Sequence, residues 1–150
     1  LHKQSSRSRS DLPIVLLTMQ PYGEFLDGYI IDTIKLLHGK VKWILRLHPR
    51  QVGEEHKLEK LVRESDILDD VVNDQFKNST LPEALAASSL HITKSSGSVI
   101  EASLLDIPNV ILDSLGAELY AEWVKTGKAV LCLNSGSKEL ASAIINSLGK

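Results

Sequence analysis

The chain has 150 residues, of which 43% are hydrophobic and 24% are charged, and its formal net charge is -2 at pH 7. This length and composition fit one globular domain with a buried core. Nucleic acid is disfavoured as the main partner, because the chain has no basic excess to neutralise phosphates along a strand.

Cys132 is the only cysteine, so the sequence contains neither a disulfide framework nor the cysteine spacing of a metal site. We therefore expect a reducing, cytoplasmic compartment and no bound metal. No apolar run reaches transmembrane length and no signal peptide is evident. Residues 1–10 are rich in serine and arginine and predict a linker or disordered terminus, followed by one domain over 11–150. Because the chain begins at Leu1 and not at Met, we expect a piece of a longer protein.

Predicted strands and helices alternate along the chain. Apolar, β-branched runs predict six strands, at 12–18, 41–47, 67–72, 90–93, 109–113 and 129–133. Apolar residues at helical spacing predict helices at 24–38, 54–64, 80–87, 99–105, 116–126 and 137–148. Thr80 and Glu83 have the spacing of a capping box, which marks the start of one of these helices. The alternation predicts an α/β fold with a doubly wound, mainly parallel six-stranded Rossmann-like sheet in the order 3-2-1-4-5-6.

In that strand order the first and fourth strands are neighbours at the topological switch point. Ligands of such sheets bind there, outside the carboxyl ends of the strands. The loops predicted to meet at this point are 20–24, which contains Gly23, and 95–98, with His48 beside them at the end of the second strand.

The loop Ser95-Ser96-Gly97-Ser98 joins a predicted buried strand to a helix. Its free backbone N–H groups and the positive end of the helix dipole suit a phosphate. Gly97 lacks the Cβ that would hold a ligand away, and the serine hydroxyls add donors. Glu101, one turn later, could accept a hydrogen bond from a sugar hydroxyl. The alternative is that the serines only cap the helix and that Glu101 only favours its N-terminus.

His48 is the candidate catalytic residue. Pro49 fixes its place at the strand end, from which the imidazole could donate to a phosphate oxygen near neutral pH. The alternative is a histidine that only ends the strand. Asn73 could face a base or a ribose, but a role in a turn is equally compatible with its position. His91 lies inside a predicted strand and is more typical of a core histidine than of a base.

Other nucleotide and hydrolase motifs are missing. No GxGxxG follows the first strand, and no GxxxxGK[ST] occurs anywhere in the chain. The residues around Gly97-Ser98-Val99 also lack the spacing of a nucleophile elbow.

Three segments together resemble the C-terminal half of GT-B-fold enzymes: LRLHP at 45–49, TKSSGSVIEA at 93–102 and IPNVILD at 107–113. That superfamily includes many glycosyltransferases and the non-hydrolysing UDP-GlcNAc 2-epimerases. The spacing from Ser96 to Glu101 is similar to an epimerase Ser-Gly-Gly stretch and its glutamate. The His-Pro pair and paired serine resemble bacterial sialyltransferases and CDP-glycerol-type polymer transferases.

The resemblance implies roles for individual residues. Gly97 and the three serines, with His48, would contact phosphate, and Glu101 would contact the ribose. Ser98 stands where epimerases have a second glycine, and His48-Pro49 replaces a His-x-Asn-Pro pattern. Both departures favour a transferase over an epimerase.

The sequence therefore predicts the nucleotide-sugar-binding domain of a GT-B-like glycosyltransferase, serving a bacterial surface polysaccharide. Its donor would be a nucleotide-sugar, with no further cofactor, and a missing N-terminal domain would bind the acceptor. We expect the isolated chain to bind without turnover, and any attachment to the inner membrane to reside in the missing part. The alternatives are an epimerase half and a non-catalytic α/β interaction domain.

Overall fold

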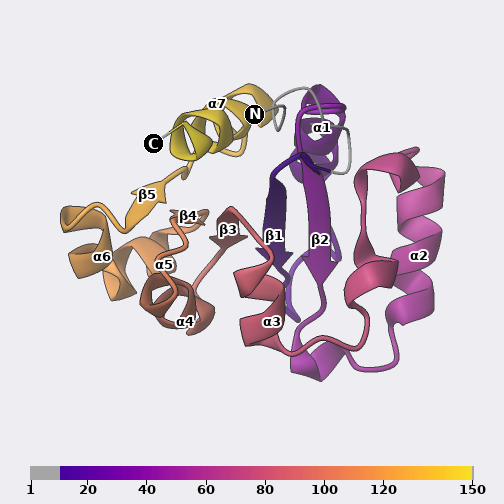
Figure 1. Ribbon diagram of the computed structural model, residues 1–150, viewed down its shortest axis with the longest axis horizontal. Coiled ribbons are helices and arrows are strands. Elements are labelled where there is room, and N and C mark those ends of the chain that lie inside the picture. The colour runs from indigo at the N-terminus through magenta and orange to yellow at the C-terminus, as the bar shows by residue number, and fades with distance from the viewer. Residues whose placement is uncertain (1–10, 150) are drawn as a thin grey trace, which may run out of the picture.

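Five parallel strands form one sheet in the order β2-β1-β3-β4-β5 within residues 11–149, the part of the chain that the computed structural model describes (Figure 1). Apolar residues dominate these strands, as expected where both faces of a sheet are covered. The strands are β1 (Ile14–Thr18), β2 (Lys42–Arg46), β3 (Leu90–Thr93), β4 (Asn109–Ile111) and β5 (Ala129–Leu131).

Helices cover both faces of the sheet. They are α1 (Gly28–Leu36), α2 (Glu55–Glu64), α3 (Leu81–Ala86), α4 (Ser98–Leu104), α5 (Ser114–Leu119), α6 (Ala121–Lys125) and α7 (Ser137–Leu148). Short 3₁₀ turns are η2 (Pro49–Gln51), η3 (Leu68–Asp70) and η4 (Asn73–Phe76). Figure 1 shows α1 and α7 together on one face and α3 and α4 on the other. None of the helices in the described region is long and apolar enough to cross a membrane.

Alternate residues of the central strand β1 divide the core between the two faces. Val15 and Leu17 belong to the larger apolar cluster, which α1, α2 and α7 complete. Leu16 points the other way and packs in a separate cluster with Leu85 of α3 and Ala102 of α4. This period of two is what places each strand residue on a defined side of the sheet.

The predicted α/β class, the parallel sheet and the relative order of five of its strands are confirmed. The prediction of six strands is wrong, because residues 67–72 do not form a strand. Asp66 has a positive φ of 61°, and the 3₁₀ turn η3 follows. Only Val71 makes a bridge with Trp43 of β2, in the parallel sense. Adjacent aspartates are poor strand formers, and here they serve a turn.

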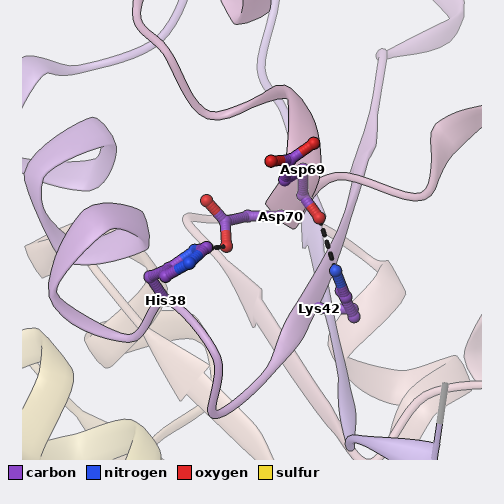
Figure 2. A network of polar contacts seen from close by, with 4 residues as sticks. All are labelled: His38, Lys42, Asp69 and Asp70. Atoms are coloured by element: carbon purple, nitrogen blue, oxygen red, sulfur yellow. Dashed lines mark hydrogen bonds and ion pairs between the residues drawn. The ribbon is translucent and has the colours of Figure 1, made fainter. Parts of the chain in front are cut away.

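Polar contacts hold η3 in place, as Figure 2 shows. The buried Asp70 carboxylate lies 2.8 Å from Nδ1 of His38, which follows α1. Lys42 at the start of β2 donates to the backbone carbonyl of Asp69. These contacts use the side chain of Asp70 and the main chain of Asp69 in a turn, so the segment lies beside β2 without extending the sheet.

The Asn73 side chain takes over the pairing that a sixth strand would have supplied. Its Oδ1 accepts from the Leu45 N–H at 2.8 Å, and its Nδ2 donates to the Leu45 carbonyl at 2.9 Å. Both backbone groups of a buried residue in β2 are thus satisfied by one amide, which fits the rule that buried backbone groups are paired.

The predicted helix over 116–126 is two helices, α5 and α6. They meet at Tyr120, whose φ of -114° and ψ of 30° are outside the helical range. The Asp113 carboxylate caps α5 by accepting from the Gly116 N–H at 2.8 Å. A Cβ at Gly116 would lie 2.6 Å from Cγ2 of Ile111, so glycine is required there for close packing.

We expect Asn73→Ala to lower the free energy of unfolding by about 1–3 kcal/mol, because the Leu45 N–H and carbonyl lose their partner. Urea unfolding followed by circular dichroism measures this change. Exposed Asn78→Ala is the matched control and should change stability by less than about 0.5 kcal/mol. Equal stabilities of the two variants would contradict the pairing role.

Candidate functional site

A cleft of about 800 Å³ opens at the carboxyl ends of the strands on the β1–β2 side of the sheet. Thr18 at the end of β1, Arg46 and His48 at the end of β2, and the loop 96–98 after β3 line it. Because β1 pairs with both β2 and β3, the topological switch point lies between β1 and β3. The wall of the cleft that Thr18 and the loop 96–98 form therefore lies where doubly wound sheets bind their ligands.

The predicted loop residues do not share one environment. Ser96, Gly97 and Ser98 all line the cleft, but Ser98 is only 5% exposed and its hydroxyl forms hydrogen bonds inside the protein. Gly97 adopts a right-handed helical conformation, and a Cβ placed on it would have no protein atom within 4 Å. Within the described chain its N–H donates to no other residue. Gly97 therefore leaves an open approach to a free backbone donor.

His91 lies at the centre of a buried polar network that reaches the loop Ser95–Ser98, here called the serine loop. Its Nδ1 is 2.7 Å from Oδ1 of Asn109 on β4. Its Nε2 is 2.9 Å from Oγ1 of Thr18 on β1 and 3.2 Å from Oγ of Ser98 on α4. The Ser98 hydroxyl is also 2.8 Å from that of Ser96. The network thus connects three strands to the wall of the cleft.

Burial lowers the pKa of His91 to about 4, against the raising effect of its hydrogen bond with Asn109. The imidazole is fully shielded from solvent, so the charged form would lose its hydration. His91 is therefore neutral at physiological pH. The prediction of a core histidine is confirmed, but the ring also contacts two hydroxyls near the cleft.

His48 caps the 3₁₀ turn η2. Its Nδ1 accepts a hydrogen bond from the Arg50 N–H at 3.0 Å, and its own N–H donates to Oε1 of Gln51 at 2.7 Å. Since Nδ1 is an acceptor, the neutral ring carries its proton on Nε2. The capping contacts leave this Nε2–H as a donor on a half-buried residue that lines the cleft.

The other predicted contacts are arranged differently. Glu101 is exposed and lines the cleft. Asn73 lines it too, although its amide is engaged with Leu45. Gly23 is exposed, has a positive φ of 75° and is not among the lining residues. The assignment of these three residues to nucleotide binding stays a prediction.

Two contacts join the loop 20–27 to the start of the serine loop and the residue before it. The Tyr22 hydroxyl lies 3.3 Å from that of Ser95, and Lys94 forms an ion pair with Asp27 at 3.4 Å. Ser95 is thus occupied by the neighbouring loop. Sequence reasoning missed this contact, because nothing in the local pattern relates residues more than 70 positions apart.

Thr18 and Asn109 are functional candidates that the sequence did not indicate. Each reads as an ordinary polar residue at a strand terminus. Their importance arises from strand register. Asn109 of β4 lies opposite His91 of β3, and Thr18 at the end of β1 lies within hydrogen-bond distance of the His91 ring. A polar residue at a buried strand position, opposite a histidine, was the one available signal.

No protein-family model and no curated protein sequence matches the chain, but solved structures do. The C-terminal CMP-Kdo-binding domain of WaaA from Acinetobacter baumannii is similar over 99% of this chain and 84% of that one, with a TM-score of 0.64 and 11% identity. The chain has the C-terminal GT-B fold. This confirms, at the level of fold, the resemblance drawn from the three sequence segments.

Two longer proteins contain the same GT-B half. The UDP-GlcNAc 2-epimerase of Methanocaldococcus jannaschii, solved with UDP-GlcNAc and UDP, has a TM-score of 0.58 and 19% identity over 94% of this chain. MnaA of S. aureus, solved with UDP, has a TM-score of 0.63 and 15% identity over 95% of it. The chain spans only 40% and 38% of these two proteins.

Stability of this GT-B domain should depend on the protonation of His91. Because its pKa falls from 6.5 to about 4 on folding, the unfolded chain takes up the proton first as the pH drops. The neutral form of His91 therefore contributes fully to the free energy of unfolding above pH 6.5. As the pH falls from 6.5 to 4, the free energy of unfolding decreases by roughly 3 kcal/mol.

Urea unfolding from pH 7 to pH 4 tests this expectation. We expect His91→Gln to remove this share of the pH dependence, although it lowers stability at pH 7. His56→Gln is the matched control, because the His56 side chain is fully exposed. An unchanged pH profile in His91→Gln would show that His91 is not buried in its neutral form.

Proposed function

We propose that this chain is the nucleotide-sugar-binding domain of a GT-B-like glycosyltransferase that builds a bacterial surface polysaccharide. The observation that carries the proposal is the cleft that reaches the switch point and is lined by free donors from two loops. Support comes from the matched WaaA domain, which binds CMP-Kdo and shares the fold over 84% of its own length and 99% of this chain. The compartment proposed for it is the cytoplasm, where nucleotide-sugars would be available.

The reaction would be attack of an acceptor hydroxyl on the anomeric carbon of the donor sugar, with the nucleotide as leaving group. Negative charge grows on the leaving phosphate, so donors that are already in place stabilise the transition state. The Gly97 N–H and the Nε2–H of His48 are two such donors on the cleft wall. The acceptor site would lie on a further domain, so this chain alone should bind without turnover.

An epimerase half is the second candidate function. It is favoured by the match to the UDP-GlcNAc 2-epimerase, which spans 94% of this chain. Incubating the full-length protein with UDP-GlcNAc, with and without an acceptor, separates the two. Interconversion of UDP-sugars without an acceptor would identify an epimerase, and acceptor-dependent release of nucleotide would identify a transferase.

Titration calorimetry with UDP, CDP and CMP tests the proposed function directly. Binding at micromolar to millimolar affinity is expected, since the chain would form only half of the complete cleft. No binding of any nucleotide at millimolar concentration would instead favour a non-catalytic interaction domain.

We expect Gly97→Ala to weaken nucleotide binding by about tenfold or more, because the new Cβ stands in the approach to the free N–H. Stability should hold or rise by about 0.4–1 kcal/mol, since alanine fits this backbone conformation. Calorimetry and thermal unfolding measure the two effects. Gly116→Ala is the control, because its Cβ would clash with Ile111 and lower stability instead. Unchanged affinity in Gly97→Ala would remove this loop from the phosphate site.

We expect His48→Asn to weaken UDP or CDP binding about tenfold or more, the value of a hydrogen bond to a charged group. Asparagine can still accept from the Arg50 N–H and cap η2, but it lacks the Nε2–H donor. Affinity for the bare nucleoside should stay the same. Equal losses for nucleotide and nucleoside would leave His48 with a structural role.

A further inference from the structure

The proton positions around His91 follow from the partners of Asn109. The two hydrogens of the Asn109 Nδ2 are shared among three acceptors: the carbonyl of Lys128 at 3.2 Å, that of Val99 at 3.4 Å and the Ser103 hydroxyl at 3.2 Å. Carbonyls only accept, so the Asn109 amide oxygen must face His91. Nδ1 of His91 therefore carries the proton and donates to that oxygen. In the neutral ring, Nε2 is left as an acceptor.

Three hydroxyls form a chain from this acceptor to the cleft. Thr18 Oγ1 is 2.9 Å from Nε2, Ser98 Oγ is 3.3 Å from Thr18 Oγ1, and Ser96 Oγ is 2.8 Å from Ser98 Oγ. Each hydroxyl has one proton, and Nε2 supplies none. All three contacts are made together only if every hydroxyl donates towards His91. Ser98 Oγ is also 3.2 Å from Nε2, and if Ser98 donates there, its contact with Ser96 still requires the Ser96 proton. Turning the Ser96 proton into the cleft costs the chain one internal hydrogen bond.

Both lone pairs of the Ser96 hydroxyl are then left to accept hydrogen bonds. One accepts from the Ser98 N–H at 3.2 Å, and the other remains available on a half-buried residue that lines the cleft. Ser96 thus offers the ligand an acceptor. A phosphate oxygen, itself an acceptor, would have to reverse the chain, whereas a ligand hydroxyl would complete it.

We propose that His91 is a positioning residue that makes Ser96 a hydrogen-bond acceptor in the cleft, so that Ser96 recognises a hydroxyl of the bound nucleotide-sugar and not its phosphate. The inference rests on the proposed function and deepens it. It differs from the sequence-based expectation, in which all the loop serines contact phosphate. Phosphate recognition is then left to the backbone of Gly97 and to His48.

Calorimetry with matched ligands tests the role of Ser96. Wild type and Ser96→Ala are each titrated with UDP, 2′-deoxy-UDP, 3′-deoxy-UDP and a UDP-sugar, and with the CDP series in parallel. We expect Ser96→Ala to lose about threefold to tenfold in affinity, one hydrogen bond's worth, only for ligands that carry the recognised hydroxyl. Equal losses for every phosphorylated ligand, or no loss, would overturn the inference.

His91→Asn tests the positioning role. Asparagine can still reach Asn109 but supplies no acceptor at the place of Nε2, so Thr18 would donate to Ser98 and the Ser96 proton would turn outward. We expect this variant to lose the preference for the hydroxyl-bearing ligand while it keeps affinity for the deoxy-nucleotide. A purely structural role would weaken both ligands equally, and that result would overturn the assignment.

Nitrogen-15 spectroscopy of wild-type His91 needs neither a ligand nor a variant. We expect a protonated Nδ1 and an unprotonated Nε2 at pH 7. The opposite tautomer would overturn the inference whatever the protein binds. Failure of wild type to bind any of the nucleotides would overturn the proposed function and the inference with it, whereas binding without dependence on a hydroxyl would overturn the inference alone.

Discussion

Parallel pairing of β1 with both β2 and β3 is the constraint on which the rest of the structure depends. Parallel strands cannot be joined by a tight turn, so each must be followed by a crossover through a helix. The chain crosses to one side of β1 through α1 and to the other side on its way to β3. The connections that leave the carboxyl ends of β1 and β3 then run to opposite faces of the sheet, through α1 and α4 (Figure 1). A crevice at that place follows from the strand order and does not require any particular side chain.

Local sequence patterns predicted most of the fold because period and capping are local properties. The strand at 90–93 and the helix at 137–148 have the predicted bounds. The capping box at Thr80 also has both of its hydrogen bonds, from the Glu83 N–H and to the Glu83 side chain. The failure at 67–72 has a non-local cause. The apolar run is real, but buried Asp70 is held by His38 and Asn73 occupies the edge of β2.

The sequence predicted which loops form the candidate site, but not which atoms of the site donate hydrogen bonds and which accept them. The rings of His48 and His91 each have two nitrogens that can donate or accept, and nothing in a sequence distinguishes those nitrogens. Here their partners impose opposite tautomers: the Arg50 N–H claims Nδ1 of His48 as an acceptor, and the Asn109 carbonyl claims Nδ1 of His91 as a donor. The Nε2 of His48 is consequently a donor, whereas the Nε2 of His91 is an acceptor. Strand register and tertiary packing determine this difference.

The amide of Asn73 has a consequence for the solubility of the sheet. Unpaired strand edges invite addition of a strand from another molecule, which is how many sheet proteins aggregate. Along β2 the exposed edge is already used, by the bridge at Val71 and by both polar atoms of one side chain. Among residues 11–149 the edge left open is that of β5, which is only three residues long and ends at the partly exposed Leu131. A strand added from another molecule would therefore have to pair with β5, which offers few backbone hydrogen bonds.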